Sequence, residues 1–524
     1  MTNKYILHFI INNNNFIKRS IFLLITYKDI LIPDRFREST IHREFLADET
    51  ESDRARIVFS SPFRRLQQKA QVFSLEHNSA VRTRLTHTLE VAHLGRSIAK
   101  KILFGLDKET KNSLGLENID KEQSFIDIVE TACLMHDIGN PPFGHFGEQA
   151  IKKWFKKNIH SDLNKSLKSQ LKDNEDLIKQ NKAIFTQDLE PDFIEFDGNA
   201  QGFRIVTKLQ WNRDECGLNL TVTQIAALLK YLNSPKELKK DKKISKKPGY
   251  FFCEKPTFDK IWEKLKLLPT QRHPLNIIME AADDIAYCLS DIEDGIEKGI
   301  INHAFFIEKS TEEWKNILSK YKVNDEFYLS IIEKTKKNYP QNRFYFNFKI
   351  ALTTKLINYA AQQYIKLQDN ILKGSEQCSL FDNKSPESLS LLALKSFARK
   401  YLFTTKEAEN IELAGYSIIT GLLDKLRILL QYSMDDFQLV LKDEFKTSLG
   451  YDTDLERRLV HKLPKKYIEL YRYCIKELTN YEANCKYAYE WYYRAHLIVD
   501  YLSGMTDNFA LELYQLLMGI KVGD

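Results

Sequence analysis

Four residues from three separate parts of the chain have side chains suited to binding one divalent metal ion. They are His87, the adjacent pair His136 and Asp137, and Asp283. The adjacent pair ends the apolar run ETACLMHDIG, where a carboxylate is costly unless a cation neutralises it. Neighbouring residues on a helix point about 100° apart, so both side chains can reach an ion just beyond the helix end. An HD dipeptide alone is weak evidence, because it often occurs by chance.

The first of the distant ligands lies in the predicted amphipathic helix RTRLTHTLEVAHLGRSIAKKI (82–102). Arg84 and His87 are three residues apart on this helix and share one face. His93 follows six residues after His87 and points about 240° away around the helix. We therefore interpret His87 as the ligand and His93 as structural.

The second distant ligand lies in the predicted helix 276–296. Asp283, Tyr287 and Asp291 follow at intervals of four residues and form one stripe beside an apolar face. A carboxylate in such surroundings again favours a bound cation. Two imidazoles and two carboxylates suit Mn²⁺, Fe²⁺ or Mg²⁺ better than a closed structural zinc site.

The stretch CLMHDIGNPPFGHFGEQA (133–150) joins half of this metal site to a second pair of titratable residues. His145 and Glu148 are three residues apart at the start of the next predicted helix, so they share a face and can hydrogen-bond. The intervening GNPPFG predicts a rigid turn, with glycines where the backbone bends and prolines that fix φ. The alternative for Glu148 is a simple interaction with the positive end of the helix.

The elements that must position these residues are predicted to be helices. The chain has 524 residues, 43% of them hydrophobic, with only 19 Gly and 13 Pro. From about residue 34 nearly to the end, charged and apolar residues alternate with helical spacing. The sequence therefore predicts an all-α fold. Lys-, Asn- and Ser-rich runs at 160–182, 234–249 and 368–388 predict solvated helix faces or loops.

Charge and cysteine content place few limits on function. The net charge of +6 comes from 77 basic and 71 acidic residues, so nucleic-acid binding is neither required nor excluded. The seven cysteines form no CxxC pair, which is typical of reduced cytoplasmic thiols. The longest clean apolar run near the start, residues 21–27, is too short to cross a membrane. We expect residues 1–34 to be an extension with a doubtful start codon.

The order His87, His136-Asp137, Asp283 resembles the H...HD...D signature of the HD-domain phosphohydrolases, an all-α superfamily that binds a divalent metal. Seven blocks also resemble, in order, those of the deoxyguanosine triphosphate triphosphohydrolases (dGTPases). They are RIVFSSPFRRLQQKAQVF, TRLTHTLEVA, CLMHDIGNPPFGHFGEQAI, FDGNAQGFRIV, LLKYL, RHPLNIIMEAADDIAY and DYLSGMTDNFA. These blocks span about 50–510; the N-terminal 30 residues and the lysine-rich insert near 240 depart from the pattern.

This resemblance implies an HD-domain helical bundle with additional C-terminal helices. The expected organisation is the extension 1–34, a catalytic helical domain 35–310, and a helical region 311–524 that completes the site and the oligomer interface. The implied reaction is hydrolysis of dGTP, and of other dNTPs if base selection is loose, to deoxynucleoside and inorganic triphosphate. Water attacks the α-phosphorus with the help of one Mn²⁺ or Mg²⁺ ion per site.

The resemblance also implies roles for the acid pair and for two cations. His145 is expected to protonate the leaving 5′-oxygen, while Glu148 holds its tautomer and raises its pKa. Arg84, one turn before His87, is placed to reach the α-phosphate. Lys230 resembles the second cation of the family, with Tyr231 beside it. We interpret Arg64 and Arg65 as structural or interface residues.

Four further residues are expected around the sugar and phosphates. Gln71 resembles the position that reads the sugar 3′-hydroxyl, and a ring packed against C2′ would exclude ribonucleotides. Tyr287 and Asp291 are expected to approach the sugar and the outer phosphates. For Asn199 only proximity to the site is expected, since a structural turn is an equal alternative.

Two other functions stay open at this point. One is another HD-superfamily enzyme, such as a nucleotide monophosphatase, cyclic phosphodiesterase or (p)ppGpp hydrolase, although these lack the GNPPFGHFGEQA block. The other is a nucleotide sensor or single-stranded DNA binder without activity, which would not need an acid. A homo-oligomer with a hexamer favoured, and a single-stranded DNA or nucleotide effector, are the expected partners; no membrane is involved. Base preference is not indicated by the sequence.

Overall fold

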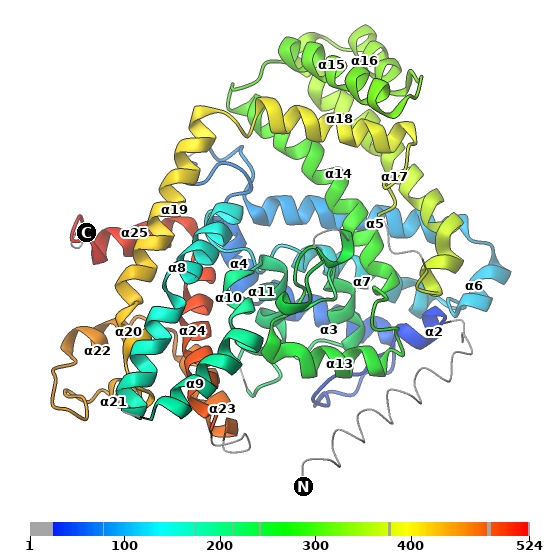
Figure 1. Ribbon diagram of the computed structural model, residues 1–524. Coiled ribbons are helices and arrows are strands. Elements are labelled where there is room, and N and C mark those ends of the chain that lie inside the picture. The colour runs from blue at the N-terminus through cyan, green and yellow to red at the C-terminus, as the bar shows by residue number, and fades with distance from the viewer. Residues whose placement is uncertain are drawn as a thin grey trace.

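The computed structural model describes residues 25–76, 78–172, 174–211, 213–239, 243–375, 379–478 and 484–521. Within these ranges the regular elements are helices and no β-strand occurs (Figure 1). Backbone pairing outside helices is limited there to two isolated bridges, Ala70 with Thr83 and Lys446 with Asp452. The predicted all-α fold is confirmed.

The centre of the molecule is a bundle built on α5 (Arg84–Gly105), α7 (Ile119–Met135) and α14 (Pro274–Glu297), which pack on one another. Thr83 caps α5 by accepting from the backbone amide of Thr86. Gly95 lets α5 approach α7 closely, because a Cβ there would lie 2.5 Å from Cys133 Sγ. Helices α3 (Leu46–Val58) and α12 (Val222–Leu228) pack on α7.

A second group of helices covers one side of this bundle. α8 (Gly144–Leu171) is its longest member and packs against α19 (Lys406–Leu426), which also contacts α25 (Asp507–Leu517). The strongly buried α24 (Lys486–Ser503) packs on α8, α9 (Glu175–Ile184) and α23 (Lys465–Glu477). The last helices of the chain therefore lie beside helices from its first third (Figure 1).

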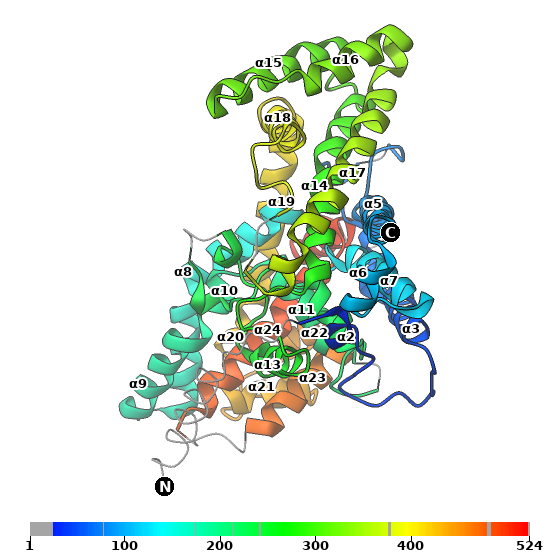
Figure 2. The same ribbon diagram turned by 90° about the vertical axis from the view of Figure 1, so that its right-hand side faces the viewer.

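A third group rises above the bundle in both views (Figures 1 and 2). It contains α15 (His303–Tyr321), α16 (Phe327–Asn338), α17 (Phe344–Leu372) and α18 (Pro386–Tyr401). α17 packs on α5 and α14, so helices from both sides of the expected boundary near 310 share contacts. The division into 35–310 and 311–524 stays a prediction.

Shorter helices join these groups. They are α2 (Tyr27–Ile30), α4 (Ser61–Arg65), α6 (Lys108–Leu114), α10 (Pro191–Ile194), α11 (Gly198–Arg204), α13 (Lys255–Lys264), α20 (Ile428–Gln431), α21 (Met434–Leu441) and α22 (Asp454–Val460). α2 falls within the expected extension 1–34, yet its Tyr27 and Ile30 are fully buried. The helical body therefore includes residues 25–34, while residues 1–24 of the expected extension lie outside the described residues. Among the described helices, none is long and apolar enough to cross a membrane.

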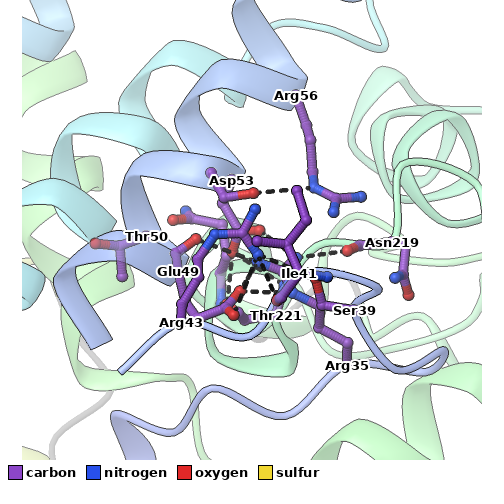
Figure 3. A network of polar contacts seen from close by, with 12 residues as sticks. Arg35, Ser39, Ile41, Arg43, Glu49, Thr50, Asp53, Arg56, Asn219 and Thr221 are labelled. Atoms are coloured by element: carbon purple, nitrogen blue, oxygen red, sulfur yellow. Dashed lines mark hydrogen bonds and ion pairs between the residues drawn. The ribbon is translucent and has the colours of Figure 1, made fainter. Parts of the chain in front are cut away.

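A buried polar network fastens the segment after α2 to the bundle (Figure 3). Arg35 donates to Asp53 Oδ1 at 2.5 Å and to the carbonyl of Asn219 at 2.6 Å, and it also binds Glu49. Asp53 Oδ2 accepts from the amide and the hydroxyl of Thr221 at 3.0 and 2.7 Å. Arg35 thus neutralises two carboxylates that α3 buries.

Replacing Arg35 with methionine is expected to lower the free energy of unfolding by about 3 kcal/mol, because two buried carboxylates lose their cation. Urea denaturation followed by circular dichroism measures this. The matched control is Arg54→Met on α3, where the arginine side chain is 39% exposed and pairs with Glu51 and with Glu130. The control should change stability by less than about 1 kcal/mol. Equal effects of the two variants would contradict the prediction.

Candidate active site

The structure brings the four predicted metal ligands together from three helices. The ligand atoms of His87, His136 and Asp137 all lie within 4.8 Å of one another. Asp283 Oδ1 is 3.5 Å from His87 Nε2 and 3.6 Å from His136 Nε2. His87 stands on the first turn of α5, His136 and Asp137 directly follow α7, and Asp283 lies midway along α14.

The surroundings of His136 and His87 leave both imidazoles available to bind a cation. His136 Nδ1 lies 2.7 Å from the carbonyl of Cys133, so Nδ1 carries the proton and Nε2 offers its lone pair to the cluster. His87 is 1% exposed, and neither of its ring nitrogens has a hydrogen-bond partner. An unpaired buried imidazole is costly, and a coordinated ion would satisfy it. The residues present therefore fit a divalent metal ion.

The two carboxylates of the cluster are ionised. Burial alone would raise the pKa of Asp137, but Arg84 and then His136 outweigh it and lower that pKa. Burial is likewise outweighed at Asp283, where His136, His87 and Lys230 hold the pKa well below its usual range. Arg84 donates to Asp137 Oδ2 at 2.6 Å, and Asn140 Nδ2 donates to Asp137 Oδ1 at 2.6 Å. Asp137 is thus oriented by two side chains.

Asn140→Ala is expected to weaken Mn²⁺ binding about 10-fold, because it removes a hydrogen bond that orients a ligand without removing the ligand. Isothermal titration calorimetry of the metal-free protein measures the dissociation constant. Asn347→Ala serves as the control, since Asn347 is half-buried on α17, away from the cluster, and donates to the carbonyl of Arg343 at the start of that helix. An unchanged affinity in Asn140→Ala would show that Arg84 alone orients Asp137.

The turn after the metal ligands, residues 136–143, is named the HD turn here. Phe143 and Gly144 both adopt left-handed backbone conformations, with φ of 60° and 53°. Gly139 is needed for a different reason, because a Cβ there would lie 2.1 Å from the carbonyl oxygen of Gly198. The backbone therefore bends at the end of the turn, whereas Gly139 allows the turn to pack closely against α11.

His145 and Glu148 form the predicted pair at the start of α8. His145 Nδ1 lies 3.0 Å from Glu148 Oε2, and Glu148 Oε1 accepts from the amide of Gly198 at 2.8 Å. Glu148 is buried, whereas the side chain of His145 is 63% exposed. Both carboxylate oxygens are occupied by these partners, so Glu148 orients His145 and does not merely neutralise the helix end.

A cleft of about 420 Å³ lies over the metal cluster and the acid pair, within the size range of small-molecule sites. Its lining includes Gln71, Arg84, His87, Asp137, His145, Asp283, Tyr287 and Asp291. Phe403, Ile411 and Glu412, from α19 and the segment before it, also line the cleft. Sequence reasoning missed these three, because no spacing in that stretch links them to the metal ligands.

Besides Arg84 Nε and the ring nitrogens of His87, two further cleft side chains have buried polar atoms without hydrogen-bond partners. Gln71 Oε1 and both carboxylate oxygens of Asp291 are buried and lack hydrogen bonds. Burial, with Asp294 and Asp283 nearby, raises the pKa of Asp291 well above its usual range. Burial thus favours the protonated form of Asp291, which offers the cleft a hydrogen-bond donor as well as an acceptor.

Lys230 and Tyr231 do not line this cleft. They line a neighbouring cavity of about 160 Å³, where Lys230 Nζ is 3.3 Å from Glu280 Oε1. The ion pair with Glu280, supported by Tyr231, outweighs burial and raises the pKa of Lys230. Lys230 remains close enough to the cluster to help lower the pKa of Asp283.

The other predicted residues are also away from the cleft lining. Asn199 donates to Asp197 Oδ1 at 2.7 Å, and Asp197 also pairs with Lys247 at 2.9 Å. Sequence reasoning overlooked Lys247 because it lies in a lysine-rich run that was interpreted as solvated. His93 is exposed, as expected for a residue outside the site.

The two arginines predicted to be structural make backbone contacts. Arg64 donates to the carbonyl of Phe59, and Arg65 donates to the carbonyl of Gly504 at 2.6 Å. Both contacts lie within this chain.

Comparison with known proteins agrees with this geometry. Residues 84–188 match the HD domain family, and residues 456–516 match the phosphohydrolase-associated domain. The chain is 38% identical over 489 residues to the deoxyguanosinetriphosphate triphosphohydrolase of Yersinia enterocolitica serotype O:8 / biotype 1B. That alignment covers 90% of this chain and 94% of the relative. The chain therefore belongs to the deoxyguanosinetriphosphate triphosphohydrolase family of HD-domain phosphohydrolases.

Proposed function

We propose that the chain hydrolyses dGTP to deoxyguanosine and inorganic triphosphate. The observation that carries this proposal is that one cleft joins a fitted cation site to a paired acid, His145 with Glu148. Mn²⁺ or Mg²⁺ is the proposed ion, held by His87, His136, Asp137 and Asp283. When bound, such an ion makes the α-phosphorus more electrophilic and a water more acidic.

His145 is the proposed general acid. The nucleoside 5′-oxygen is a poor leaving group and needs a proton as its bond to phosphorus breaks. Glu148 is buried and accepts from Nδ1, so it orients the ring and leaves Nε2 as the nitrogen proposed to donate the proton. A binding protein without activity would not require this pair, and the sensor alternative loses support accordingly.

The sugar and α-phosphate are proposed to lie over the stripe on α14. Arg84 lines the cleft beside Asp137 and presents its guanidinium to a phosphate oxygen. The unpartnered Gln71 Oε1 and the buried Asp291, whose pKa is raised by burial, supply polar groups for the 3′-hydroxyl. Tyr287 supplies the ring proposed to pack on C2′ and exclude ribonucleotides.

The outer phosphates are proposed to extend toward Lys230, Tyr231 and Lys247. Lys230 and Tyr231 line the cavity next to the cleft, and Lys247 pairs with Asp197 beside Asn199. For Asn199 the proposal is still only proximity to the site. The base is proposed to contact Phe403 and Glu412, which line the cleft. A carboxylate can accept from both the N1–H and the 2-amino group, and among the four DNA bases guanine alone presents these two donors together.

Product analysis tests the proposal. The protein is incubated with dGTP and Mn²⁺ or Mg²⁺ in ¹⁸O-labelled water, and products are identified by ³¹P NMR and mass spectrometry. Attack at the α-phosphorus predicts deoxyguanosine and triphosphate, with the label in triphosphate. Orthophosphate or pyrophosphate would favour another HD-superfamily hydrolase. Tight dGTP binding without products would favour a nucleotide sensor.

Assembly and location are proposed on further observations. A homo-oligomer is supported by large exposed apolar side chains such as Phe104 and Ile119, which are 85% and 86% exposed, and a hexamer is the form proposed. Light scattering after size-exclusion chromatography measures the number of subunits.

A cytoplasmic location is supported by the six described cysteines, which are all free thiols. A single-stranded DNA or nucleotide effector would find a cavity of about 450 Å³ whose lining includes Arg37, Arg43 and Arg56.

A further inference from the structure

The C-terminal segment 503–507, which joins α24 to α25, is bound to two parts of the active site. Lys69 Nζ donates to the carbonyl of Ser503 at 2.8 Å and to the carbonyl of Asn140 in the HD turn at 2.5 Å. Lys69 is 3% exposed, and burial lowers its pKa to about 7. A buried amine between two carbonyls ties the C-terminal segment to the HD turn.

Asp507 makes a second and more direct connection. Its Oδ1 accepts from the amide of Phe143 at 3.0 Å, and its Oδ2 accepts from the amide of Ala70 at 3.0 Å. Asp507 is 3% exposed, so water does not compete for these bonds. One carboxylate therefore holds two backbone segments that are otherwise separate in the chain.

The amides of Ala70 and Phe143 lie within two residues of Gln71 and His145, which line the cleft. Ala70 directly precedes Gln71, and Phe143 lies two residues before His145. Phe143 adopts φ of 60°, which is unfavourable for a bulky residue unless its surroundings hold it. The bond from its amide to Asp507 is one such restraint at the start of α8.

A purely local role does not explain Asp507. It is the first residue of α25, where an acidic side chain is favourable near the helix dipole. The cap of that helix, however, is Thr506, whose side chain accepts from the amide of Phe509. Both oxygens of Asp507 are directed instead to amides more than three hundred residues earlier in the chain.

We propose that Asp507 is a positioning residue that sets His145 and Gln71 relative to one another across the cleft. This inference rests on the proposed function, because Gln71 is taken to bind the sugar and His145 to protonate the leaving oxygen. Asp507 acts through backbone amides and does not touch the substrate.

The decisive variant is Asp507→Asn in the full-length chain. The asparagine side chain has the same shape but only one acceptor oxygen. The backbone N–H of either Phe143 or Ala70 would therefore face the side-chain NH2 group, which is itself a donor. We expect kcat/KM for dGTP to fall about 10- to 100-fold, as for a catalytic group that is displaced slightly. The preference for dGTP over 2′,3′-dideoxy-GTP should also narrow, because Gln71 no longer sits correctly for the 3′-hydroxyl. Mn²⁺ affinity should stay within about twofold, because no ligand is changed.

Hydrogen–deuterium exchange gives a readout that is independent of turnover. Peptides that contain Ala70 and Phe143 should both exchange faster in Asp507→Asn than in the unchanged chain. The matched control is Asp454→Asn, at the first position of α22, where Asp454 is half-exposed and pairs with Arg458. It should leave kcat/KM, substrate preference and exchange at both peptides unchanged.

An unchanged preference for dGTP over the dideoxy nucleotide in Asp507→Asn would overturn the proposal. Should that variant not fold, Lys69→Met breaks the same connection at another point, and it must then show the lowered kcat/KM. Failure of both variants to fold would also overturn the proposal, because the contacts would then serve stability alone. A wild-type chain that releases no triphosphate would refute the proposed function instead, while the exchange experiment would still report on Asp507.

Discussion

Replacing His136 with alanine is expected to abolish both metal binding and turnover. The side chain contributes one of four ligands, and its Nε2 is already directed at the cluster by the bond from Nδ1 to the Cys133 carbonyl. Its loss leaves Asp137 and Asp283 close together with one imidazole, His87, to share a cation. Since altering a residue that only supports a ligand costs about 10- to 100-fold in metal affinity, loss of a ligand should cost more.

Calorimetric titration with Mn²⁺ and the triphosphate-release assay measure the two effects in the same preparation. The control is His93→Ala, which removes an exposed imidazole from α5, the helix that carries His87. That variant should bind Mn²⁺ and turn over dGTP like the unchanged chain. Measurable Mn²⁺ binding at unchanged affinity in His136→Ala would contradict the assignment of the cluster.

Replacing His145 with alanine is expected to lower kcat by about 10²- to 10⁴-fold while Mn²⁺ binding is retained. The side chain is not among the clustered ligands, and its Nδ1 is bound to Glu148 at 3.0 Å. The loss should therefore concern proton transfer alone. A phosphodiester with a p-nitrophenyl leaving group needs no protonation, so its hydrolysis should be much less sensitive to the substitution.

The matched control for this variant is His160→Ala. His160 lies on the same helix, has a side chain that is 61% exposed, and pairs with Glu190 at 3.1 Å. It resembles His145 in exposure and pairing but is absent from the cleft lining. Equal losses for dGTP and for the p-nitrophenyl substrate in His145→Ala would show that His145 does not act as the acid.

Much of the site could be predicted because its chemistry is encoded in local spacing. The intervals between Arg84 and His87, between His145 and Glu148, and along the stripe from Asp283 correctly indicated shared helix faces. Periodicity also predicted the helices that carry them, since apolar faces at helical spacing must be buried.

Contacts between distant segments could not be predicted from such intervals. Arg84 lines the cleft and also donates to Asp137, which lies 53 residues later, and the spacing did not indicate this second contact. The ion pair of Lys230 with Glu280, in the cavity that both residues line, was likewise not indicated by any interval in the sequence. Phe403, Glu412 and Lys247 carry no pattern of their own, because their positions depend on how whole helices pack.

Protonation was also beyond prediction from spacing. Asp291 follows Asp283 on one stripe, and this spacing indicates no difference between the pKa values of the two carboxyl groups. The structure separates them, because Asp283 faces two imidazoles while Asp291 is buried beside other carboxylates. The pKa of one falls and that of the other rises for reasons that only packing determines.

The bond between Lys69 and Ser503 joins residues 434 positions apart, and it has a consequence for protein synthesis. A ribosome makes the chain from its N-terminus, so all four metal ligands emerge well before Ser503 and Asp507. A nascent or prematurely terminated chain therefore has every group needed to capture a metal ion but lacks the contacts that fasten the HD turn. Fastening of the HD turn therefore waits until residues 503–507 have been synthesised.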